Sequence, residues 1–157
     1  MPQHQMIFVN LPVDDLDRSR AFFTGLGYTF DENFCDGNAL CLELGPSLYA
    51  MLLRRDFFAG FHDRRTADAG TVETLLALSV DSREDVDALA DRAVDLGGTA
   101  VRSEDMGLMY GRSWSDPDGH VWEVMWMDPA FAGAGPGAAD GGTVEVGTEQ
   151  VVAGRGA

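Results

Sequence analysis

The sequence contains no lysine. All 11 of its basic residues are arginine, against 26 aspartates and glutamates, so the formal net charge is −15. A chain this acidic lacks the basic face that phosphate contacts require, and we expect neither nucleic acid nor an anionic membrane as a partner. Cysteine is also scarce, since Cys35 and Cys41 are too few for a disulfide framework and lack the spacing of a metal site.

Long apolar runs are missing as well. No stretch approaches the roughly 18 to 20 apolar residues that a membrane helix needs, and the first residues show no charged segment followed by an apolar core. We therefore expect a cytoplasmic protein. The chain has 157 residues with 45% hydrophobic and 24% charged residues, which is the composition of an ordinary globular domain.

Strand and helix patterns alternate along the first four fifths of the chain. Two amphipathic helices are expected, one beginning after Asp14-Asp15 and ending at Gly27, the other beginning at Ser82 and ending at Gly97. A short aromatic segment at 56–61 predicts one helical turn. Runs of β-branched, aromatic and alternating apolar residues predict strands at 6–13, 28–33, 39–44, 48–54, 72–80, 99–102, 110–114 and 120–127.

The pattern is repeated within the chain. Val13-Asp14 before the first helix and Leu26-Gly27 after it recur as Val80-Asp81 and Leu96-Gly97. Each copy is a βαβββ module, and two modules can cover each other and enclose a cleft between curved sheets. We therefore predict an α+β fold with one domain at 1–130. Its expected parts are module one at about 4–61, a linker at 62–70 and module two at 71–128.

The end of the chain has a different composition. Residues 131–157 are rich in glycine and alanine and lack apolar periodicity, with a weak possible strand at 144–151. Such a segment does not bury enough apolar surface to offset the cost of ordering it. We therefore predict a mobile tail.

One carboxylate stands in an apolar strand near the end of module two. Asp116-Pro117-Asp118-Gly119 predicts a tight turn, and the strand after it carries Glu123. A buried carboxylate needs a partner. Counting back from the turn pairs Arg112 with Glu123 and places Tyr110 and Trp114 on the same face. Arg112 is therefore our candidate ionic partner, and the alternative is that Arg112 faces solvent while water or backbone meets Glu123.

Other polar and aromatic residues have less specific roles. Asn10 lies in an apolar strand and either donates to a ligand carbonyl or fills a structural hydrogen bond. Tyr110 offers a hydroxyl with the same two interpretations. His120 is out of phase with Glu123, which predicts a surface position on the opposite face. An aromatic cluster beside the linker forms either a pocket lid or a dimer contact, through Phe57, Phe58 and Phe61.

Several segments together resemble the vicinal-oxygen-chelate superfamily, which includes glyoxalases, bleomycin-resistance proteins and extradiol dioxygenases. The resemblance spans 6–127 and is carried by 13–19, Phe22-Phe23, 26–28, 77–81 and 116–119 followed by Glu123. It implies a glyoxalase-like fold in which two βαβββ modules form a cup-shaped curved sheet. It also implies a homodimer, because such modules share sheet edges or faces between chains.

The same resemblance bears on metal binding. Members of the superfamily hold in the cup a divalent metal that polarises two adjacent substrate oxygens. Its four ligand positions fall on Phe8, Met51, Leu75 and Glu123 of this sequence, and only Glu123 suits a hard divalent ion. We therefore expect no complete metal site and no cofactor, with Glu123 as the one candidate metal ligand.

Three functions follow as expectations. The first is a protein that binds a small, partly apolar molecule in the cup, and the acidic balance favours a cationic one. Its candidate ligand-binding residues are Phe8, Asn10, Met51, Tyr110, Arg112 and Trp114. The alternative is a metal-dependent lyase or dioxygenase of glyoxalase type that uses Glu123 as a ligand, and the third is an inert scaffold or regulator.

Overall fold

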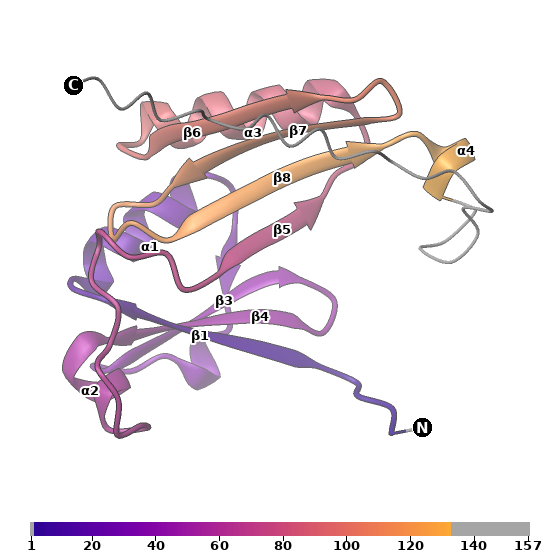
Figure 1. Cartoon of the computed structure of the whole chain (residues 1–157). Helices are drawn as coiled ribbons and strands as arrows, with labels where there is room; N and C mark the ends of the chain where they lie inside the picture. The colour runs from indigo at the N-terminus through magenta and orange to yellow at the C-terminus, as the bar shows by residue number, and fades with distance from the viewer. Residues whose placement is uncertain (1, 133–157) are drawn as a thin grey trace, which may run out of the picture. The chain divides into compact units, whose positions relative to one another are not determined.

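The computed structural model describes residues 2–132 (Figure 1). Residues 1–127 make one compact unit, and a second unit begins at Asp128 and contains the short helix α4, Pro129–Ala132. From residue 133 on, the predicted tail and its possible strand lie outside the described residues. No helix in the described part is long and apolar enough to cross a bilayer.

The first module builds a four-stranded sheet. Its strands are β1 (Ile7–Val13), β2 (Thr29–Phe30), β3 (Ala39–Gly45) and β4 (Leu48–Arg54), in the order β1-β4-β3-β2. The helix α1 (Leu16–Gly25) follows β1, and β1 runs parallel to β4. The short helix α2 (Arg55–Ala59) ends the module, and residues 60–74 lead to the second one.

The second module repeats this topology. Its elements are β5 (Leu75–Ser79), α3 (Arg83–Asp95), β6 (Thr99–Asp105), β7 (Met109–Ser115) and β8 (Val121–Met127). The sheet order is β5-β8-β7-β6, with β5 parallel to β8. The predicted α+β fold with two βαβββ modules is thus confirmed, as two separate sheets that are not closed into a barrel.

The two helices begin and end as predicted. The side chain of Asp15 caps α1 by accepting the Arg18 N–H, and Ser82 caps α3 by accepting the Asp85 N–H. After each helix a glycine adopts a positive φ, 97° at Gly27 and 100° at Gly97. Equivalent signals in the sequence therefore produce equivalent helices.

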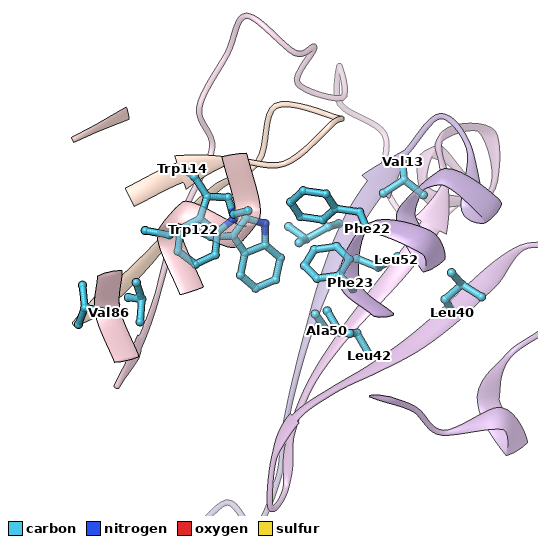
Figure 2. Close-up of a cluster of buried hydrophobic side chains, with 14 residues drawn as sticks. Val13, Phe22, Phe23, Leu40, Leu42, Ala50, Leu52, Val86, Trp114 and Trp122 are labelled. Atoms are coloured by element: carbon cyan, nitrogen blue, oxygen red, sulfur yellow. The ribbon is translucent and has the colours of Figure 1, made fainter. Parts of the chain in front are cut away.

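A single hydrophobic core joins the two modules. Phe22 and Phe23 of α1 point toward Trp122 of β8, and the Phe23 and Trp122 rings lie 5.2 Å apart in an edge contact (Figure 2). The same cluster contains apolar side chains from both sheets and from α3, among them Leu42, Leu52, Val86 and Trp114. Each sheet therefore has one face on this shared core.

Two predicted strands are shorter than expected. Only Thr29–Phe30 of the 28–33 segment is a strand, because the Asp31 side chain accepts the Asn33 N–H and starts a 3-10 turn at Glu32–Phe34. The strand expected at 72–80 begins at Leu75, where pairing with Val121 starts. Neither change affects the sheet order.

Candidate functional site

The face of each sheet that points away from the shared core is here called its cup face. On the first sheet the cup face carries Phe8, Asn10, Tyr49 and Met51, which alternate with core residues such as Leu11 and Leu52. Phe8 lies beside Tyr49 and Asn10 beside Met51 in the strand register. The Phe8 and Tyr49 rings are stacked, 4.9 Å apart and 13° from parallel, and form a flat aromatic surface.

The cup face of the second sheet carries Ala77, Ser113, Glu123 and Met125. Glu123 lies between Ala77 on β5 and Ser113 on β7. A pocket opens on this face, and its lining includes three methionine side chains together with Ser113 and Glu123. The methionines come from the β6–β7 turn, β7 and β8: Met106, Met109 and Met125.

Glu123 is half-buried and has no direct ion-pair partner. Within residues 2–132 it takes part in no ion pair and no side-chain hydrogen bond. The other acid of the pocket, Glu104, is bound by Arg102 at 2.8 Å. The pocket therefore holds one carboxylate without a counter-charge.

The predicted pairing of Arg112 with Glu123 is wrong. Arg112 lies opposite Val124, and Ser113 lies opposite Glu123, one residue away from the predicted register. The cause is the connection between β7 and β8. In this turn the Gly119 N–H donates to the Asp116 carbonyl. Gly119 itself has a φ of 90° and belongs to the connection, which is therefore one residue longer than the two-residue turn assumed from sequence. A shift of one residue moves a side chain to the other face of the sheet.

Three candidate ligand-binding residues consequently lie on the core-side face of β7. Arg112 binds Asp87 and Asp91 of α3 at 2.9 and 2.8 Å. The Tyr110 hydroxyl donates to Asp87 at 2.7 Å, and this bond, with that from Arg112, lowers the pKa of Asp87. Trp114 is 1% exposed in the core.

The six candidate ligand-binding residues therefore share no common surface. Phe8, Asn10 and Met51 lie on the cup face of the first sheet, whereas Tyr110, Arg112 and Trp114 lie behind that of the second. Arg112 also contributes to the pocket lining. Their assignment as ligand contacts stays a prediction.

The turn before β8 holds polar residues whose roles the sequence reasoning missed. Asp118 accepts the Asp14 N–H at 2.8 Å and the Arg18 guanidinium at 2.8 Å, which ties the turn to the beginning of α1. His120 is buried, not at the surface as predicted, because its Nε2 reaches the Pro12 carbonyl at 2.7 Å. The repeated acids around Pro117 were the available signal, since Asp116-Pro117-Asp118-Gly119 contains more carboxylate than a simple hairpin turn requires.

Asp116 organises the inside of the same turn. Its side chain accepts the backbone N–H groups of Asp118 and His120 and the indole N–H of Trp122. Burial raises the pKa of Asp116, against the opposing effect of these donors and of His120. The turn is thus a structural unit, and its acids face away from the cup.

The cup faces do not fit the metal that the superfamily implies. Of the four expected ligand positions, Phe8 and Leu75 carry no donor atom, and the thioether of Met51 suits soft ions only. In the part of the chain that the structure describes, no group of three His, Cys, Asp or Glu residues is placed to hold an ion. Glu123 is the single hard donor among the four positions.

Comparison with known proteins agrees with this architecture. The family model described as bleomycin resistance protein-like N-terminal matches residues 5–45. A hypothetical protein from S. aureus, SA1046, is 25% identical and covers 80% of this chain and 95% of its own, with a TM-score of 0.69. No curated protein sequence matches the chain.

Two further solved structures show the same fold. A glyoxalase/bleomycin resistance protein/dioxygenase family enzyme from Burkholderia phytofirmans is 20% identical, with 76% of this chain and 96% of that chain covered and a TM-score of 0.64. A lactoylglutathione lyase from Agrobacterium tumefaciens is 19% identical, with coverages of 80% and 96% and a TM-score of 0.60. The predicted glyoxalase-like fold is confirmed: the chain shares the fold of these glyoxalase/bleomycin-resistance structures, and its first 45 residues include the match to the bleomycin resistance protein-like model.

Proposed function

We propose that the protein binds a small, partly apolar molecule in a cup formed by two copies of the chain, without the complete metal site of its superfamily. The observation that carries this proposal is the pocket around Glu123. Its methionine side chains offer adaptable apolar contact, and its Ser113 and Glu123 offer polar contact. The proposal needs no catalytic group.

The replaced ligand positions support the metal-free part of the proposal. Phe8, Met51 and Leu75 present apolar side chains on the cup faces, at positions where a metalloenzyme of the superfamily would place donors. A lone carboxylate holds a divalent ion weakly, because such ions need several hard oxygen or nitrogen donors. We therefore expect ligand binding to persist after chelation.

The exposed apolar residues support the second copy. Phe8 is 45% exposed and Leu75 is 56% exposed, each on the cup face of its sheet. In a two-fold symmetric dimer, the cup face of the first sheet of each chain can pack against the cup face of the second sheet of the other chain. The two equivalent contacts would cover all four cup faces. The Phe8–Tyr49 surface would then lie across from Glu123 of the partner.

Calorimetry on chelator-treated protein tests the binding and the metal separately. We expect 1-naphthylmethylammonium to bind with the same affinity before and after treatment with EDTA. We also expect Ni²⁺, Zn²⁺ and Mn²⁺ to bind at less than one ion per chain. Stoichiometric binding that is lost in Glu123→Ala but kept in Glu104→Ala would instead support the alternative, a metal-dependent lyase or dioxygenase.

Sedimentation equilibrium tests the dimer. Phe8→Glu places a charge on the proposed contact and should convert the dimer to a monomer. Phe61→Glu is the matched control, because Phe61 is also an exposed phenylalanine but follows α2 and belongs to neither sheet. Dissociation by Phe61→Glu alone would move the dimer contact to the aromatic cluster beside the linker. A protein that is monomeric without any substitution would reject the two-copy cup.

A further inference from the structure

The charges around the second sheet's pocket are almost all paired within the chain. Arg102 and Glu104 both line the pocket and bind each other. Arg112 contributes to the lining, but its guanidinium is held on the other side of the sheet by two acids of α3. Glu123 has no such partner among the described residues, so the pocket carries one uncompensated negative charge.

Any ligand that closes over this pocket removes water from Glu123. A half-buried carboxylate keeps part of its hydration in the open pocket, and that hydration is lost when apolar surface covers it. A neutral ligand leaves the charge unpaired, and an anion adds repulsion. A cation replaces the lost water with a charge-assisted contact. The pocket therefore discriminates by charge.

The other residues that line the pocket indicate what the uncharged part of the ligand is like. Met106, Met109 and Met125 present unbranched, polarisable side chains, which adapt to apolar groups of different shapes. Ser113, directly opposite Glu123, supplies a hydroxyl. The pocket thus suits an apolar body that carries a single positive group.

We infer that this pocket takes a lipophilic monocation, an aromatic or alkyl ammonium, with Glu123 as its counter-charge. The inference rests on the proposed function and adds the chemical class of the ligand. Glu123 then occupies the position of a metal ligand in the superfamily but binds the cationic group of the ligand directly. The net charge of −15 adds long-range attraction for the same class of molecule.

NMR of methionine methyl groups tests the inference with three small molecules that share a naphthyl group and differ in charge. The probes are 1-naphthylmethylammonium, 1-naphthylmethanol and 1-naphthoate, at one pH and ionic strength. Binding is followed on the ¹³C-labelled methyl groups of Met109 and Met125, assigned through Met→Leu variants. We expect the ammonium to bind about 10- to 100-fold more tightly than the alcohol, from the usual strength of charge-assisted hydrogen bonds. The naphthoate should bind most weakly.

Two variants separate a direct contact from general electrostatics. Glu123→Gln removes the unpaired charge of the pocket, whereas the double variant Arg102→Gln/Glu104→Gln removes the paired charges and leaves the net charge unchanged. Glu123→Gln should abolish the preference for the ammonium, whereas the double variant should keep it. Equal losses in the two proteins would overturn the role of Glu123.

The remaining outcomes distinguish this inference from the proposed function. If the alcohol binds as tightly as the ammonium and shifts the same methyl groups, the charge class is wrong and the binding function stands. If none of the three probes shifts Met109 or Met125, the result contradicts the binding function in this pocket as well.

Discussion

Replacing Asp118 should destabilise the fold more than replacing any exposed acid, because this residue joins the two modules. Its side chain is 1% exposed, and it accepts a backbone N–H from Asp14 and the guanidinium of Arg18, both at 2.8 Å. The Ser19 hydroxyl lies at 3.4 Å, the limit of a useful hydrogen bond. Asp118→Ala removes all three contacts and leaves a backbone donor without a partner.

The expected cost follows from these contacts. A hydrogen bond to a charged group contributes about 1.5–3 kcal/mol, which applies to the Asp14 N–H. The Arg18 side chain is 44% exposed and regains water when its partner is lost, so its share is about 1 kcal/mol or less. We expect Asp118→Ala to lower the free energy of unfolding by about 3 kcal/mol. Asp118→Asn, which keeps an acceptor, should cost about 1 kcal/mol.

Urea unfolding measures this cost. Trp114 and Trp122 are both buried in the core, so their fluorescence reports loss of tertiary packing. The control is Asp56→Ala, which breaks the exposed pair between Asp56 and Arg54 and should cost less than about 0.5 kcal/mol. If Asp118→Ala costs no more than Asp56→Ala at an unchanged m-value, the reasoning about this contact is refuted.

Two further predictions concern turn geometry and titration. Gly119→Ala should lower the free energy of unfolding by at least about 1 kcal/mol more than Gly27→Ala does. Both glycines have a positive φ, but only at Gly119 would an added Cβ clash, 2.9 Å from the Ala69 carbonyl oxygen. Equal losses of free energy in urea unfolding would contradict this. Arg83 lowers the pKa of Asp105 to about 2, so the stabilisation from this pair is present above the ordinary pKa and is lost as the pH falls toward 2. Arg83→Gln should therefore raise the pKa of Asp105 toward its ordinary value, while the Gly107 N–H still holds it below that value, and an unchanged titration of the Asp105 carboxyl resonance would contradict the pairing.

The module topology was predictable because its signals are local and occur twice. Asp15 and Ser82 cap the helices by accepting backbone N–H groups, and Gly27 and Gly97 end them with positive φ. These interactions depend on residues within about one helical turn, so the pattern of side chains is sufficient to locate them. The spacing of apolar residues then predicted which faces of the helices and strands meet in the core.

Which face of the sheet each β7 side chain occupies was not predictable, because it depends on the conformation of one glycine. Counting across a hairpin requires the number of residues in the turn, and Gly119 adds one by adopting a φ of 90°. The sequence contains the glycine but does not state whether it belongs to the turn or to the strand. His120 was misplaced for a related reason, since its partner, the Pro12 carbonyl, belongs to a distant strand.

This single-residue shift also changes the chemistry expected of the cup. In the predicted register Arg112 would neutralise Glu123, and only the overall acidity of the chain would favour a cationic ligand. In the observed register the α3 acids Asp87 and Asp91 bind Arg112 from the opposite side of the sheet. Glu123 is left without an ion-pair partner among the described residues, in a pocket lined by methionine, because the other arginine of the lining, Arg102, binds Glu104. In the binding function that we propose, the bound molecule supplies this charge, and the charge of the ligand is then the property that the pocket selects.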